Sequence, residues 1–238
     1  MEVDILAIGV HPDDVEISAA GTLLAHIAMG KTAGIVDLTR GELGTRGTAQ
    51  TRDAEAAEAA KILGVSFRKN LEMADGFFTN DETHVRKVIQ VLRLHKPTIV
   101  LCNAIADRHP DHGRAAALIN DACFLSGLIK IETAYNGQVQ QAHRPKAVYH
   151  YTQDRYIKPD FLVDISAHVK TKEAALRAYK TQFYNPNSDE PGTYISSPEF
   201  FASIFNRNAE FGRQIGVAFA EPFTSYKIIG VKNLFNLL

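Results

Sequence analysis

The chain is poor in cysteine and has no long hydrophobic run, and each scarcity excludes a class of protein. Its two cysteines, Cys102 and Cys123, have the spacing of neither a redox motif nor a zinc-binding pair, so no disulfide framework is expected. No apolar stretch approaches the roughly 18 to 20 residues that span a bilayer, and the N-terminus lacks the basic start of a secretory signal. We therefore expect a cytoplasmic protein without a membrane partner.

An excess of charge of either sign is also missing. The 26 basic and 27 acidic residues give a formal net charge of -1, which argues against a general electrostatic attraction to nucleic acid. The length of 238 residues and the 45% share of apolar residues suit one large α/β domain with a packed core. We predict a single domain over residues 1–238 and no nucleic-acid partner.

Apolar runs of strand length alternate with segments of helical period, which is typical of βαβ units. In the first half, strands are expected over 4–10, 32–38, 66–71 and 98–102, and helices over 21–29, 51–63, 81–95 and 113–128. In the less regular second half, strands are expected over 147–151 and 161–163, and helices over 167–181 and 198–215. The pattern predicts an α/β fold with an open, doubly wound (Rossmann-like), mainly parallel sheet and helices on both faces. Residues 184–197 are expected to form an exposed loop, either a lid or a disordered excursion.

A tetrapeptide that combines histidine and aspartate occurs twice. Residues 11–14 read His-Pro-Asp-Asp, residues 109–112 read His-Pro-Asp-His, and each copy follows a short apolar run. Either copy alone could be a turn in which proline stiffens the exit from a strand and aspartate caps the next helix. However, ligands of open α/β sheets bind beyond the carboxyl ends of the strands, where the two copies would meet. Their recurrence favours a metal site, because a catalytic zinc needs three N or O ligands, an open position and usually a nearby carboxylate base.

These motifs carry a resemblance to a known family. The strand followed by His-Pro-Asp-Asp-Val-Glu at 11–16, together with Arg-His-Pro-Asp-His at 108–112, resembles the LmbE-like, or PIG-L-type, zinc-dependent N-acetylglucosamine deacetylases. The resemblance extends through residues 38–44, 75–76 and 216–222. Within this family the chain is most similar to the deacetylases of bacillithiol biosynthesis, which remove the acetyl group from N-acetylglucosaminyl malate.

By motif position, the resemblance implies one zinc ion held by His11, Asp14 and His112, with Asp13 as the general base. Zinc lowers the pKa of a bound water to about 7, so a neighbouring carboxylate can take its proton at neutral pH. The sequence does not fix the metal, since a site of N and O ligands also accepts iron, cobalt or nickel.

The resemblance makes His109 the acid or oxyanion partner, oriented by Asp111. A contact with the Asp111 carboxylate would favour an imidazolium that stabilises the oxyanion. The leaving amine must finally gain a proton, and the sequence leaves both Asp13 and His109 open as its donor.

The expected substrate-binding residues follow other strands of the same sheet. Arg52 matches a substrate-binding arginine of the family, and malate would offer it a carboxylate. Asp75 matches a position that bonds sugar hydroxyls, with a turn before Gly76 as the alternative. Glu42 is a looser match and could be a solvated loop charge. Tyr194 could supply a phenolic donor, although Phe200 takes the place of the family's usual tyrosine.

The leading hypothesis is therefore a hydrolase that removes the N-acetyl group from a small-molecule glycoside, N-acetylglucosaminyl malate in bacillithiol biosynthesis. One alternative is a related amidase that acts on another glucosamine conjugate or an acetylated oligosaccharide. A second is a non-catalytic sugar-binding module with a structural metal, against which the base beside three ligands argues. The resemblance also makes a homo-oligomer plausible.

Overall fold

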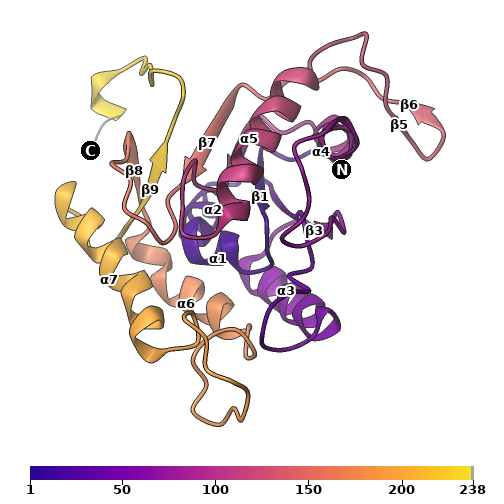
Figure 1. The fold of residues 1–238 in the computed structure, drawn as a ribbon. Coiled ribbons are helices and arrows are strands. Elements are labelled where there is room, and N and C mark those ends of the chain that lie inside the picture. Colours follow the sequence, from indigo (N-terminus) through magenta and orange to yellow (C-terminus); the bar gives the residue numbers. More distant parts are fainter. Residues whose placement is uncertain (237–238) are drawn as a thin grey trace.

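A seven-stranded sheet forms the centre of the structure, a computed structural model that describes residues 1–236 (Figure 1). The strand order is β3-β2-β1-β4-β7-β9-β8. The strands are β1 (Ile5–Gly9), β2 (Ala33–Asp37), β3 (Phe67–Asn70), β4 (Ile99–Cys102), β7 (Ala147–Tyr151), β8 (Phe161–Asp164) and β9 (Ala220–Thr224). The first five strands in this order are parallel to their neighbours, and β9 runs antiparallel to both β7 and β8. The expected open, mainly parallel sheet is confirmed.

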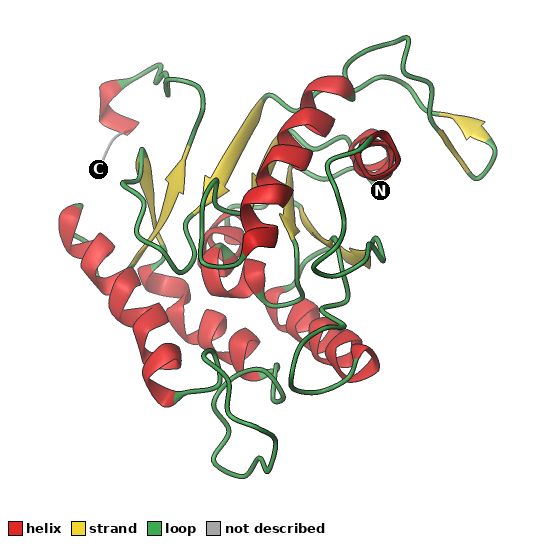
Figure 2. Cartoon of the chain, viewed as in Figure 1, coloured by secondary structure: helices red, strands yellow, loops and turns green. Residues whose placement is uncertain are grey.

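Helices cover both faces of the sheet (Figure 2). They are α1 (Asp14–Ser18), α2 (Ala20–Ala28), α3 (Ala49–Leu63), α4 (Glu82–His95), α5 (Pro110–Leu125), α6 (Val169–Arg177) and α7 (Pro198–Gln214), with short 3-10 turns η1 (Ser166–His168) and η2 (Leu234–Asn236). Side chains alternate along β1, so Ile5 and Ala7 join the core under α1, α2, α3, α6 and α7. Leu6 and Ile8 join the opposite core under α4 and α5. Within residues 1–236, no helix combines the length and apolarity needed to cross a bilayer.

The chain changes direction between β1 and β4, and this fixes where a ligand can bind. From β1 the chain continues to β2 and β3 on one side, then returns across the sheet to β4 and β7 on the other. Loops that leave the carboxyl ends of β1 and β4 therefore diverge and open a crevice, which is the usual ligand position in doubly wound sheets. Residues 11–14 and 109–112 both lie at this crevice.

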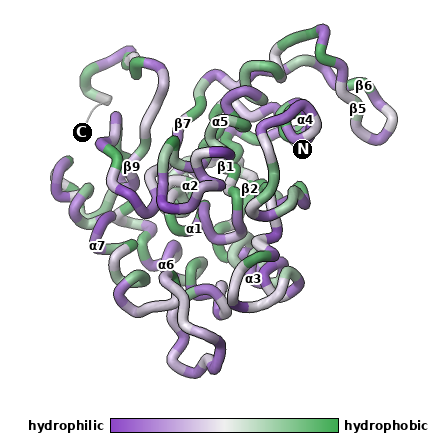
Figure 3. Tube along the Cα trace, viewed as in Figure 1, coloured by the Kyte–Doolittle hydropathy of each residue, from purple (hydrophilic) through white to green (hydrophobic). Residues whose placement is uncertain are grey.

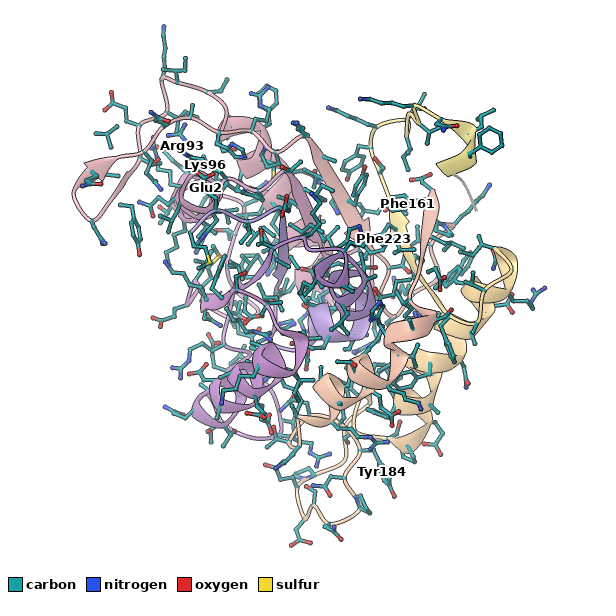
Figure 4. The ribbon with its side chains drawn as sticks, turned by 180° about the vertical axis from the view of Figure 1, so that it is seen from behind. Glu2, Arg93, Lys96, Phe161, Tyr184 and Phe223 are labelled. Carbon is teal, nitrogen blue, oxygen red and sulfur yellow. The ribbon has the colours of Figure 1, made fainter. Side chains whose placement is uncertain are left out.

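Strand β9 departs from the expected pattern, because no strand is predicted from the sequence after residue 215. It contains Pro222, which argues against a strand inside a sheet. The missing N–H of Pro222 costs no hydrogen bond with β7, because the pairing of β9 with β7 ends one residue away, at Tyr151 and Phe223. On the other side Phe223 pairs with Phe161 of β8, and Figure 4 shows their two rings side by side, with centroids 5.3 Å apart.

Three further features differ from the expectations. The segment after β1 forms the short helix α1, which ends at Ser18, and the single residue Ala19 separates it from α2. A small hairpin, β5 (Ala134–Tyr135) with β6 (Gln138–Val139), projects from the molecule between α5 and β7 (Figure 1). The helix expected over 167–181 is α6, which ends at Arg177.

A buried ion pair fixes β9 to the helices that carry the site. The Lys172 ammonium group donates to Glu221 at 2.7 Å and to the carbonyl of Ile17, at the end of α1, at 2.8 Å. The Glu221 carboxylate also accepts from the backbone N–H groups of Gly21 and Thr22 in the first turn of α2. Neither side chain of the pair is exposed.

We expect the variant Glu221→Gln to lower the free energy of unfolding by about 3 to 5 kcal/mol, because it leaves the Lys172 charge buried without its counter-ion. Urea unfolding followed by circular dichroism measures the change. The matched control is Glu210→Gln, which removes an exposed partner of Arg213 and should leave the unfolding midpoint nearly unchanged. Equal midpoints for the two variants would contradict the structural role of the pair.

Candidate functional site

The two motifs meet in a cavity of about 330 Å³ at the carboxyl ends of β1 and β4. Most of the predicted site residues line it: His11, Asp13, Asp14, Arg52, Asp75, His109 and His112. Two predicted residues do not belong to the lining. Asp111 is fully buried behind it, and Glu42 is exposed on the adjoining loop.

Asp14 is held by a dense set of hydrogen bonds. Its Oδ2 accepts from the backbone N–H groups of Val10 and His11, each at 3.0 Å, and from the side-chain amide of Asn103 at 2.9 Å. The side-chain amide of Gln153 donates to Oδ1 at 2.9 Å. Burial works against ionisation, but His112, through its charge and its hydrogen bond, and His11, through its charge and its backbone N–H, hold the pKa of Asp14 well below its usual range. The carboxylate is therefore ionised and fixed in place.

His112 lies between two carboxylates. Its Nδ1 is 2.5 Å from Oδ2 of Asp107, and its Nε2 is 3.3 Å from Oδ1 of Asp14. Burial favours the neutral ring, but both carboxylates outweigh burial and raise the pKa of His112 to about 10. A cation thus fits the position between Asp14 and His112, and a metal ion that binds there displaces the proton of the imidazolium.

In the part of the chain that the structure describes, two groups of three side chains bring possible ligand atoms within 4.8 Å of one another, namely His11 with Asp14 and His112, and His11 with His109 and Asp111. The first group is the predicted ligand set. In the second group, the oxygens of Asp111 already accept from the backbone of Gly76 at 2.9 Å and from Arg114 at 2.7 Å. The donors of the first group, two imidazoles and one carboxylate, are those of a catalytic zinc site, so the residues present fit the metal.

Asp13 combines an unusual backbone conformation with a raised pKa. Its φ of 118° lies in the region that favours glycine, and residues held in such conformations cluster at functional sites. Burial raises the pKa of Asp13 to about 7, and Arg52 opposes the rise. A carboxyl group with a pKa near neutrality is well matched to taking and returning a proton. Asp13 makes no side-chain capping bond to α1, so the alternative role of helix cap does not hold.

Arg52 occupies a different place from the one expected for a substrate-binding cation. Its guanidinium donates to the carbonyls of Gly41 at 3.1 Å and Pro12 at 2.7 Å, and to Oδ2 of Asp13 at 3.1 Å. Its side chain is 6% exposed. In this structure Arg52 holds the loop of Asp13 and has little surface left for a substrate carboxylate.

The relation between His109 and Asp111 also differs from the expected one. The contact with Nδ1 of His109 comes from the backbone N–H of Asp111, which donates to it at 3.3 Å, and not from the Asp111 carboxylate. Burial, followed by the charges of His11 and His112, lowers the pKa of His109. The backbone contact orients the ring with Nδ1 as an acceptor, so Nε2 is the nitrogen that can donate a proton.

Asp75 and Glu42 are connected to each other. Asp75 is 3.0 Å from Nε2 of His11 and accepts from the backbone of Leu43 at 3.0 Å. Glu42 accepts from the backbone N–H groups of Asp75 at 2.9 Å and Arg40 at 3.2 Å. Asp75 therefore faces the cavity, whereas Glu42 shapes the loop behind it.

The second half of the chain supplies the facing wall. Tyr194 and Phe200 both line the cavity with their ring centroids 5.2 Å apart, so both aromatic residues weighed from the sequence are present. The Tyr194 hydroxyl donates to Oδ1 of Asp154 at 2.9 Å, and Arg108 donates to Oδ2 of Asp154 at 3.1 Å.

The loop over 184–197 is hydrogen-bonded to the loop over 38–48, which follows β2 and contains Gly41, Gly44 and Gly47. Arg46 donates to Ser188 at 2.6 Å and to Glu190 at 3.3 Å, and the backbone N–H of Gly47 donates to Glu190 at 2.8 Å. Figure 3 shows the loop over 184–197 at the bottom of the view in white to purple, the colours of intermediate to hydrophilic residues. These bonds hold its later residues, which include Tyr194, at the rim of the cavity.

Several residues of the site were not predicted from the sequence: Asn103, Asp107, Gln153, Asp154 and Arg207. A signal was available for two of them. Asn103 directly follows β4 and Gln153 lies two residues after β7, both at carboxyl ends of parallel strands. The other three follow no motif.

Comparison with known proteins agrees with this geometry. A family model described as PIG-L, GlcNAc-PI de-N-acetylase, matches residues 6–123. The chain is 30% identical over 190 residues to the diacetylchitobiose deacetylase of Thermococcus kodakarensis, a match that covers 75% of this chain and 70% of the relative. The conserved protein TT1542 of Thermus thermophilus superposes with a TM-score of 0.87 at 35% identity, over 98% of both chains. The 4-carboxy-2-hydroxymuconate hydratase GalB of Pseudomonas putida KT2440 shares the fold, with a TM-score of 0.77 at 21% identity over 98% of this chain and 100% of that one.

Proposed function

The chain belongs to the PIG-L family of N-acetylglucosamine deacetylases, and from this premise we propose that its substrate is N-acetylglucosaminyl malate, as in bacillithiol biosynthesis. Its relatives are deacetylases, which hydrolyse amide bonds, and the chain is a deacetylase of N-acetylglucosamine-type substrates. Because a hydratase shares the fold, the fold alone does not decide the reaction. The observation that carries the proposed hydrolytic reaction is the buried carboxyl of Asp13 beside the cluster of His11, Asp14 and His112.

We propose that His11, Asp14 and His112 hold one zinc ion. The amides of Asn103 and Gln153 support this choice because they orient Asp14, as second partners of metal ligands usually do. When bound, zinc polarises the acetyl carbonyl and makes a water molecule acidic.

In the proposed mechanism Asp13 takes the proton of the attacking water, and Arg52 holds the Asp13 carboxylate toward the cavity. His109 lies across the cluster, with its ring centroid 4.8 Å from that of His11, and supplies a donor to the tetrahedral oxygen through Nε2. The proton collected by Asp13 then passes to the leaving amine. Asp75 positions the ring of His11 and presents its carboxylate to the sugar.

The decisive experiment is to measure acetate release from N-acetylglucosaminyl malate, from methyl N-acetylglucosaminide and from N,N'-diacetylchitobiose. We expect acetate from the malate conjugate at the highest kcat/KM, complete loss with a chelator and recovery with zinc. Highest efficiency on diacetylchitobiose would assign the chain to the oligosaccharide deacetylases. No acetate from any of the three would refute the proposed function.

A further inference from the structure

One arginine of the cavity stands apart from the others. Four arginines line the cavity, and three of them are ion-paired: Arg46 with Glu190, Arg52 with Asp13, and Arg108 with Asp154. Within the described residues 1–236, the guanidinium of Arg207 has no carboxylate oxygen within 4.0 Å and makes no hydrogen bond.

The two carboxylates that most strongly attract the charge of Arg207 already accept hydrogen bonds from other groups. Asp154 and Asp107 exert the strongest attraction on its charge. However, Asp154 accepts from Tyr194 and Arg108, one on each oxygen. Asp107 accepts from His112 on one oxygen and from two backbone N–H groups on the other. Both carboxylates are therefore held by other donors, and among the described residues neither has an oxygen within 4.0 Å of the Arg207 guanidinium.

Arg207 is also partly withdrawn from water. Its residue is half-buried, and burial is the main cause that lowers the pKa of its guanidinium. A desolvated cation without a counter-ion costs free energy, which an incoming anion recovers. Five N–H donors in a planar fork suit a carboxylate in particular.

The position of Arg207 suits the substituent of the sugar better than the acetyl group. It lies on α7, seven residues after Phe200, so the ring and the guanidinium share one face of the helix and both reach the cavity. This face lies beside Asp154, the neighbour in sequence of Gln153, which contacts Asp14. An anion at Arg207 is therefore in the same cavity as the metal cluster but against the opposite, C-terminal wall.

We propose that Arg207 is the specificity-determining residue of this enzyme, and that it binds an anionic group carried by the glycosidic substituent of the substrate. The inference rests on the proposed deacetylase function and deepens it. It transfers the carboxylate-binding role expected of Arg52 to a residue that the motifs did not indicate. The substrate class that follows is an N-acetylglucosaminide whose aglycone bears a carboxylate.

The test compares Arg207→Ala and Arg207→Gln with the unaltered enzyme on N-acetylglucosaminyl malate and on methyl N-acetylglucosaminide, which has no charge. We expect kcat/KM for the malate conjugate to fall about tenfold to a hundredfold, mainly through KM, because charge-assisted hydrogen bonds are lost. The loss on the methyl glycoside should be much smaller. The matched control is Arg213→Ala on the same helix, whose side chain is exposed and paired with Glu210.

Equal losses on both substrates, or a fall in kcat on both, would overturn the inference, since an arginine that stabilises the reacting oxygen acts on every substrate. Circular dichroism melting identifies a variant that fails to fold, and Arg207→Gln, which keeps three side-chain carbons and a polar end without the charge, serves if Arg207→Ala does not fold. Failure of the proposed function is distinguishable, because the unaltered enzyme would then release acetate from neither glycoside.

Discussion

The variant Asp13→Asn is expected to keep its metal and to lose activity by about two to four orders of magnitude, the usual contribution of a positioned proton-transfer group. An amide has the shape of the carboxylate but cannot take a proton from water. Asparagine also tolerates positive φ better than most residues, so the backbone at φ 118° is preserved. Acetate release gives the rate, and elemental analysis of the purified variant gives the zinc content.

The matched control for this change is Asp53→Asn. Asp53 lies on α3, where its half-exposed carboxylate pairs with Arg40 outside the cavity. It should retain near-normal activity. Full turnover by Asp13→Asn would remove Asp13 from the mechanism, and loss of zinc from that variant would make Asp13 a ligand instead of a base.

The variant His112→Ala is expected to purify without zinc and without activity. In the proposed site the His112 side chain supplies one of three ligands, and its removal leaves two buried carboxylates, Asp14 and Asp107, without the imidazole between them. The unaltered protein should melt at a higher temperature with zinc than after chelation, because a ligand that binds only the folded state stabilises it. That difference should vanish in His112→Ala.

Asp107→Asn provides a graded comparison. Its amide oxygen can still accept from Nδ1 of His112, but without charge, so zinc affinity should fall about tenfold to a hundredfold, as is usual when the partner of a ligating histidine is changed. The control is His168→Ala at η1, outside the cavity lining, which should bind zinc normally. Retention of stoichiometric zinc by His112→Ala would favour the other group, His11 with His109 and Asp111.

Local patterns sufficed for the first half of the fold. Strands β1 to β4 and helices α3 to α5 lie where apolar period and helix-ending residues place them, for example Gly64 in the left-handed conformation at the end of α3. Strand β9 could not be found in this way, because Glu221 and Pro222 contradict a buried strand locally. Their places depend on partners far along the chain, Lys172 and the end of β7.

The site, like the fold, has a part that sequence patterns predict and a part that only the folded structure reveals. The motifs and the strand ends sufficed to locate five residues, because residues that directly follow adjacent parallel strands lie at the same edge of the sheet. They are His11, Asp13, Asp14, His109 and His112. The role of Arg52 could not be predicted, because a guanidinium binds whichever acceptor folding brings to it, here Asp13. Arg207 follows no motif, and its lack of a partner among the described residues is a property of the folded molecule alone.

The division of the cavity between the two halves of the chain has an evolutionary consequence. The proposed metal ligands and the proposed base precede residue 113, within the part that the family model matches, whereas Tyr194, Phe200 and Arg207 come from later elements. Natural selection can therefore exchange the substrate-facing wall while the hydrolytic half stays constant. Substitutions in the C-terminal third alone would then let one ancestral deacetylase diversify toward neutral oligosaccharides and toward acidic conjugates.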